Sequence, residues 1–280
     1  MIKDSLFVFP DRKTYASSQN ARCFMFYDFE NPIGTEWLDV ANEIFLEFGQ
    51  VIAEGTGNLE KQHTHGNFNR VQKRIRGFLE SVQNGINVNF DIRIQSRSYI
   101  ESEAFFPVDI QMVLSQDREG RKKGAINVRE TLVKSYDSLI DKVAAKIFRL
   151  AGPMYANAFD FPTVFGPAAY LASLGTILSG MSVIANDIYC DRITAWRDRR
   201  SDGMLSNQGY LREVYPVNFV LDAHLKILFQ NRPFEEYMKK VGILKISEYS
   251  DKIFRWNVPE EKLDAVRLEL ESSGLILSSP

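Results

Sequence analysis

Histidines and aspartates are the residues of this chain whose types and spacing could support catalysis or metal binding. His63 and His65 form a His-x-His pair, and His224 follows far downstream. In a strand such a pair directs both rings to one side, as a zinc site requires. Here the pair sits among glycine and asparagine residues with no third ligand placed beside it. We therefore expect a solvated loop over 55–67 rather than a metal site.

Two pairs of aspartates have the spacing that places both carboxylates on one face of a helix. They are Asp137/Asp141 and Asp187/Asp191. Paired carboxylates can bind Mg²⁺ or act as general acid and base, but solvated helix faces show the same spacing. Asp187 and Asp191 are the better candidates because they follow a long uncharged segment. They support one alternative function, a metal-dependent hydrolase or nucleic-acid-processing enzyme.

Sequence motifs of enzymes are not found. Gly55-Thr56-Gly57 lacks the third glycine of a dinucleotide loop and the Gly-Lys-Ser/Thr of a phosphate loop. The chain has no Gly-x-Ser-x-Gly elbow, and neither cysteine carries a nucleophile signature. We therefore assign no catalytic residue, metal or cofactor, and the sequence favours a non-catalytic protein without excluding an enzyme.

Three basic clusters could contact nucleic acid, which gives a second alternative function. The clusters are Arg70/Lys73/Arg74, Arg121/Lys122/Lys123 and Arg192/Arg197/Arg199/Arg200. On one side of the fold they could neutralise several phosphates. Neighbouring acids such as Asp117, Glu119, Asp198 and Asp202 favour ordinary solvated faces instead.

Aromatic and arginine residues after the uncharged segment are typical of protein interfaces. Trp196 stands beside Arg197, and Tyr210 is close to Arg212. Protein interfaces are enriched in Trp, Tyr and Arg. We predict a partner-binding surface formed by Trp196, Arg197, Arg199, Tyr210 and Arg212.

The composition indicates an ordinary globular protein. Of 280 residues, 25% are charged and 45% hydrophobic, and the net charge of −2 gives no overall attraction to nucleic acid or anionic membranes. Two cysteines, Cys23 and Cys190, suit a reducing compartment. The first residues do not resemble a signal peptide. We therefore expect a cytoplasmic protein.

The elements that must position these residues are organised around one uncharged stretch. No charged side chain occurs between Asp160 and Asp187, and Ala168–Asn186 is expected to form a buried apolar central helix. A membrane span is the less favoured alternative for this stretch.

Alternating and helical hydrophobic periods predict an α+β fold, with a mostly antiparallel sheet flanked by amphipathic helices. We expect strands at 22–29, 88–95 and 108–114, helices near 35–48, 67–84 and 136–150, an exposed loop over 198–209, a short helix from Pro233, and a C-terminal hairpin, helix and strand. The chain is expected to be one unit of two halves, 1–152 and 167–280, with a soft boundary near 152–166.

Trp256-Asn257-Val258-Pro259, in the C-terminal hairpin–helix–strand segment, resembles immunity proteins of contact-dependent and type VI toxin systems. The resemblance covers about a tenth of the chain and assigns no functional residue. It implies a protein partner. Our leading hypothesis is a cytosolic bacterial immunity or antitoxin-like inhibitor of a protein toxin, which binds its partner without catalysis.

Overall fold

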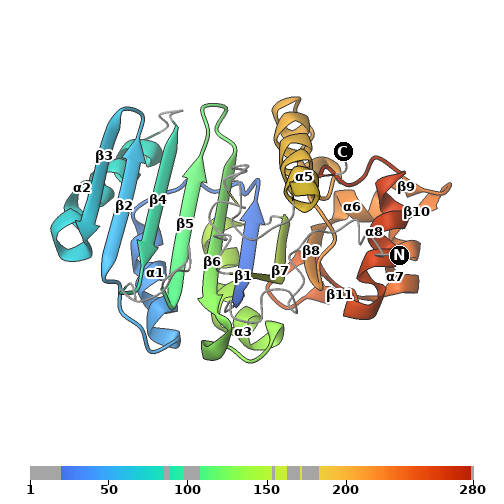
Figure 1. Ribbon diagram of the computed structural model, residues 1–280, viewed down its shortest axis with the longest axis horizontal. Coiled ribbons are helices and arrows are strands. Elements are labelled where there is room, and N and C mark those ends of the chain that lie inside the picture. The colour runs from blue at the N-terminus through green and yellow to red at the C-terminus, as the bar shows by residue number, and fades with distance from the viewer. Residues whose placement is uncertain are drawn as a thin grey trace.

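A computed structural model describes residues 20–84, 89–97, 108–152, 155–162, 171 and 183–278 of the protein. Within these residues, ten strands form one sheet in the order β11-β12-β8-β7-β1-β6-β5-β4-β2-β3 (Figure 1). Every neighbouring pair is antiparallel. The predicted α+β class and antiparallel sheet are therefore confirmed. The strands are β1 (Asn20–Tyr27), β2 (Glu54–Leu59), β3 (Gln62–Asn67), β4 (Phe90–Gln95), β5 (Ile110–Gln116), β6 (Lys122–Arg129), β7 (Tyr155–Pro162), β8 (Val217–Leu221), β11 (Ile243–Ser247) and β12 (Ser250–Asn257).

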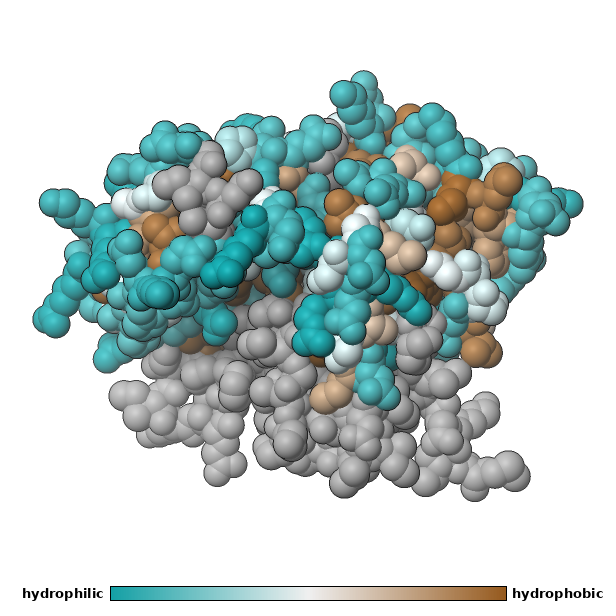
Figure 2. All heavy atoms as spheres, turned by 90° about the horizontal axis from the view of Figure 1, so that it is seen from above, coloured by the Kyte–Doolittle hydropathy of each residue, from teal (hydrophilic) through white to brown (hydrophobic). Residues whose placement is uncertain are grey.

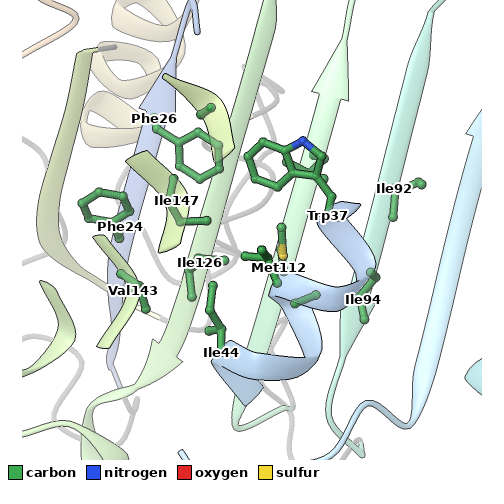
Figure 3. Packing of buried hydrophobic residues seen from close by; sticks show 14 of the residues in the cluster. Phe24, Phe26, Trp37, Ile44, Ile92, Ile94, Met112, Ile126, Val143 and Ile147 are labelled. Carbon is green, nitrogen blue, oxygen red and sulfur yellow. The ribbon is translucent and has the colours of Figure 1, made fainter. Parts of the chain in front are cut away.

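Three amphipathic helices cover the first face of the sheet. They are α1 (Glu36–Glu47), α2 (Phe68–Gln83) and α3 (Tyr136–Ala151). Trp37 of α1 stacks on Phe26 of β1 with ring centroids 5.8 Å apart, and both are fully buried (Figure 3). The Ser135 hydroxyl accepts a hydrogen bond from the Ser138 N–H and caps α3, as its sequence predicts. The three predicted helices in this half are thus confirmed.

A second set of helices lies on the other face and belongs to the C-terminal half. The set is α5 (Val183–Ser201), α6 (Asp222–Lys226), α7 (Phe234–Val241) and α8 (Leu263–Glu271). In Figure 1 α5 stands in the upper part of the view, above β7 and β8. Tyr27, Tyr155 and Trp196 meet in the core beneath it. A small hairpin of β9 (Leu228–Phe229) and β10 (Arg232–Pro233) and the 3-10 turns η1 (Glu130–Leu132), η3 (Ser206–Gln208) and η4 (Glu260–Lys262) complete the described elements.

The expected central helix over Ala168–Asn186 falls largely outside the described residues. Leu171 is described and is fully buried in the core of the second face. α5 begins at Val183. In the described part of the chain, no helix combines the length and the apolar character that crossing a bilayer requires.

The expectation of a loop over 55–67 was wrong, because these residues form the hairpin β2–β3. Gly55 and Gly57 point toward α2, and a Cβ atom at Gly55 would lie 2.8 Å from Ile75 Cδ1. The two glycines therefore let a helix approach the strand closely. The loop expected over 198–209 is also shorter than predicted, since α5 continues to Ser201 and Ser206–Gln208 form a 3-10 turn.

The C-terminal segment agrees with its sequence pattern except at the end. β11 and β12 form the expected hairpin, and α8 follows η4. Leu275–Leu277 contribute only the isolated parallel bridge Leu211↔Ile276 rather than a full strand. The two-halves boundary near 152–166 stays a prediction.

Candidate functional site

The strand register builds a continuous polar row across the second face of the sheet. Adjacent strands place these residues directly opposite one another: His63, Asn58, Asp91, Ser115, Lys123, Tyr27 and Tyr155. Alternation along each strand directs these side chains away from the face covered by α1, α2 and α3. The row thus spans seven neighbouring strands, from β3 to β7. α5 packs at the β7 end of the row.

Hydrogen bonds hold the outer half of this row. His63 Nδ1 lies 2.6 Å from the Asn58 amide oxygen, and His65 Nδ1 lies 2.9 Å from the Thr56 hydroxyl on the neighbouring row. Burial raises the pKa of Asp91, although Arg93 Nε lies 3.4 Å from its carboxylate. This half is a hydrogen-bonded polar surface.

The histidines are not brought together as a metal set. His63 and His65 are exposed on the edge strand β3. His224 is fully buried in α6, where Nδ1 accepts from the Leu221 N–H and Nε2 donates to the Tyr210 carbonyl. Within the described ranges, no group of three or more His, Cys, Asp or Glu residues could hold a metal ion.

Three cationic side chains surround the indole of Trp196, at the inner end of the polar row. The charged groups of Arg212, Arg200 and Lys123 lie 3.9, 5.5 and 5.6 Å from the ring centroid. Trp196 is 3% exposed and meets the Tyr27 ring edge to face. The Arg212 guanidinium also donates to the Tyr27 hydroxyl over 2.7 Å. We call Lys123, Trp196, Arg200 and Arg212 the indole cluster.

Asp28 fixes the end of α5 against the sheet beside the indole cluster. Its backbone adopts the left-handed conformation, with φ 55°, which aspartate tolerates better than most residues. One carboxylate oxygen forms a buried ion pair with Arg200, and the other accepts from the N–H and hydroxyl of Ser206. The carboxylate is therefore fully engaged by structural contacts.

The predicted partner-binding residues fall in this same region but differ in exposure. Trp196 and Arg212 are buried, at 3% and 2% exposure. Arg199 donates to the carbonyls of Ile276 and Leu277, and Tyr210 is partly exposed. Arg197 is exposed and pairs with the adjacent Asp198 over 3.2 Å. Trp and Arg residues in a core and those that anchor an interface look the same in a sequence. The spacing of these residues therefore could not predict whether they are exposed.

The basic clusters also have different environments. Arg70, Lys73 and Arg74 are exposed on α2, over the first face. The second and third clusters meet where Arg121 donates to the Arg200 carbonyl. Most of α5's arginines hold the fold, since Arg192 pairs with Glu213 and Glu271, Arg199 binds backbone and Arg200 binds Asp28.

The two aspartate pairs differ as well. Asp137 pairs with Arg255, and Asp141 is exposed on the same helix. Asp191 is exposed on α5, whereas the side chain of Asp187 lies outside the description. The enzyme alternative therefore gains no geometric support from the described residues.

The C-terminal elements carry an apolar surface that the sequence reading missed. Four large apolar side chains are strongly exposed there: Leu228 (70%), Ile243 (65%), Ile246 (64%) and Leu268 (56%). Figure 2 shows apolar atoms gathered at the right end of the molecule, where Figure 1 places α7, α8 and the β9–β10 hairpin. Ile243 and Ile246 belong to β11, the edge strand at one end of the sheet.

A pocket of about 550 Å³ lies between the β9–β10 hairpin and α7. Its walls include Phe229 and Tyr237, whose rings lie 4.7 Å apart, and its rim carries exposed Arg232, Glu236 and Lys240. The hairpin turns at Gln230 and Asn231, both left-handed (φ 51° and 62°), as a tight two-residue turn requires.

Tyr237 is fixed in the wall of this pocket. Its hydroxyl donates to Glu269 of α8 over 2.8 Å, and burial together with this carboxylate raises the pKa of Tyr237. We name Leu228, Phe229, Arg232, Tyr237 and Leu268 the C-terminal apolar surface. It combines a rigid wall of the aromatic residues with the exposed leucines. The signal available in the sequence was the Leu-Phe-Gln-Asn-Arg-Pro hairpin.

Comparisons with known proteins show the fold alone. No protein-family model matches the chain, and no curated protein matches it either. A solved structure described as "Pseudomonas aeruginosa T6SS protein PA0821" is similar to it, with a TM-score of 0.53 and 9% sequence identity. The likeness covers 92% of this chain and 73% of that chain.

Proposed function

We propose that this chain is a protein-binding protein that acts through its C-terminal apolar surface, as an immunity-like inhibitor that covers a bacterial protein toxin. The observations that carry the proposal are the strong exposure of Leu228 and Leu268 and the pocket walled by Phe229 and Tyr237 in the same C-terminal elements. Apolar and aromatic anchors surrounded by a charged rim are the usual composition of a protein interface. The fold similarity to a T6SS protein supports a role in such a system.

The residues predicted from the sequence enter this proposal in two ways. Arg197 is exposed and is proposed as a direct contact at the edge of the partner. Trp196, Arg199 and Arg212 are proposed to support that contact indirectly. Their side chains are buried or hydrogen-bonded to the backbone and so do not reach a partner themselves. Tyr210, partly exposed, is proposed as a further contact.

The experiment is affinity capture from the native host with matched surface variants. Leu228→Asp places a charge on the proposed surface, and Leu46→Asp places one on a comparably exposed site of α1 (58% exposed). We expect the wild-type chain and Leu46→Asp to retain the same stoichiometric protein. Leu228→Asp should weaken its binding about tenfold or more, since a central interface anchor contributes about 2 kcal/mol and about 1.4 kcal/mol is tenfold.

A growth assay tests the inhibitory role. Expression of the captured protein should slow bacterial growth, and co-expression of wild type or Leu46→Asp should restore it, whereas Leu228→Asp should not. Equal capture and equal protection by both variants would contradict the C-terminal apolar surface. A captured protein without toxicity would contradict the inhibitor role while leaving the binding role supported.

A further inference from the structure

Lys123 belongs both to the polar row and to the indole cluster. Lys123 lies on β6 directly opposite Ser115 of β5 and Tyr27 of β1. Its ammonium group lies 5.6 Å from the Trp196 ring centroid and close to two further cations, Arg200 and Arg212. Lys123 as a whole residue is partly buried.

The acidic residues around Lys123 already interact with other groups. Asp28 binds Arg200 and Ser206. Asp117 binds Arg121 over 2.7 Å, and Asp91 lies 3.4 Å from Arg93. Among the described residues, no carboxylate reaches ion-pair distance of Lys123 Nζ. Lys123 thus carries a partly buried charge with no acidic partner among the described residues, whereas such charges are normally paired.

We propose that Lys123 and Arg200 form a binding site for one compact anionic group, a carboxylate or a phosphate, with the Ser115 hydroxyl available as a neutral donor beside them. Arg200 is already paired with Asp28, so an anion there would chiefly compensate the charge of Lys123 in a partly desolvated setting, where charge-assisted hydrogen bonds are strong. This site goes beyond the proposed function, because it lies at the end of α5 and uses none of the residues of the C-terminal apolar surface.

The surroundings favour a single compact anion over a nucleic acid strand. Exposed acids flank the end of α5 and the β5–β6 turn: Glu119, Asp198 and Asp202. They would repel a polyanion that continues beyond the site more strongly than a single carboxylate or phosphate. Nucleic-acid binding also requires several neutralised phosphates, and the other arginines of α5 are held in structural contacts.

The pKa of Lys123 supports the same conclusion. Burial, with the positive charges of Arg200 and Arg212, lowers this pKa to about 7, against the weaker opposite effects of Asp117 and Asp91. A bound anion would raise the pKa again, so binding should be coupled to proton uptake near neutral pH. The groups that face Lys123 from the elements packed against it are Tyr27 (β1), Asp91 (β4), Ser115 (β5), Asp117 (β5–β6 turn), Arg200 (α5) and Arg212.

The test is calorimetric titration of the full chain with sodium phosphate and sodium acetate, at constant ionic strength and at about pH 6 and about pH 8. Lys123→Gln removes the proposed ligand. Lys122→Gln is the matched control, because the Lys122 ammonium lies at Phe29 on the other side of β6 and donates to the Glu30 and Asn31 carbonyls. Wild type and Lys122→Gln should bind one anion, more tightly at the lower pH, and Lys123→Gln should lose about tenfold or more.

The outcomes separate the possible sources of the anion. Preference for phosphate points to a phosphorylated ligand, and preference for acetate points to a carboxylate such as an acidic side chain. Stronger binding of a single-stranded oligonucleotide that also depends on Lys123 would overturn the compact site. Should Lys123→Gln unfold, NMR titration of the wild-type lysine decides: a pKa near 7 that phosphate or acetate raises supports the proposal, and one that neither changes overturns it. Equal binding by Lys123→Gln also overturns it.

Discussion

His224 shows how a buried residue couples this fold to pH. Both of its ring nitrogens bind backbone groups, the Leu221 N–H and the Tyr210 carbonyl, and the ring stacks on Tyr155 with centroids 5.6 Å apart. Burial lowers the pKa of His224 to about 4 from an ordinary value of 6.5. Protonation would disrupt the bond to Leu221, since the imidazolium cannot accept.

The sign of the resulting pH dependence follows from proton counting. Between about pH 4 and 6.5 the unfolded chain binds a proton at His224 that the folded chain does not, so stability falls as the pH falls through this range. The loss should reach about 3 kcal/mol, since one pKa unit corresponds to about 1.4 kcal/mol. Urea unfolding at a series of pH values should show that the free energy of unfolding of His224→Gln falls less steeply as the pH falls. The exposed His63→Gln should leave the pH dependence of stability unchanged. A pH dependence like that of the wild type in both variants would contradict the assignment to His224.

At the scale of elements, two glycines decide how α2 packs on β2. A Cβ at Gly55 would meet Ile75 at 2.8 Å and Phe68 at 3.1 Å, whereas a Cβ at Gly77, inside α2, meets nothing within 4 Å. The same residue type is therefore required in the strand and merely tolerated in the helix. Glycine within a helix costs about 0.5–1 kcal/mol relative to alanine.

This contrast predicts opposite effects on stability. Gly55→Val should lower the free energy of unfolding by about 1–3 kcal/mol, because the added side chain overpacks the contact with α2. Gly77→Ala should raise it by about 0.5–1 kcal/mol. Denaturant unfolding of the two variants checks both signs, and destabilisation by Gly77→Ala would show that α2 does not present that position to open space.

The same glycines explain where sequence reasoning succeeded and failed for the elements. Amphipathic periodicity located α1, α2 and α3 because each places its apolar residues on one side. β2 and β3 were missed because Gly55, Gly57, His63 and His65 have the composition of a loop. Their fit becomes visible only when α2 is placed over them, which is a tertiary contact and not a local pattern.

The candidate site was predictable to a similar, partial extent. The sequence predicted a partner-binding surface that includes Trp196 and Arg212, and the structure brings these two residues together with Lys123 across more than seventy positions of chain. Burial of the indole depends on β1 and α5 packing against each other, so no local pattern predicts it. The C-terminal apolar surface was missed for a related reason: Leu228 and Leu268 look like core residues until their neighbours are known.

At the scale of the whole molecule, one long sheet carries different surfaces at its two ends. The β3 end exposes polar residues such as His63 and His65, whereas the β11 end exposes Ile243 and Ile246. Apolar surface beside an aromatic pocket is the stronger basis for protein association, because burying it releases water. We therefore propose partner binding at the C-terminal end and anion binding at the end of α5.

The most direct test of this account is hydrogen–deuterium exchange of the chain alone and in complex with its captured protein. We predict slower exchange in the complex over 228–241, which includes the β9–β10 hairpin and α7, with no change in α2. Protection confined to α1 and α2, with 228–241 unaffected, would contradict the claim that the C-terminal apolar surface binds the partner.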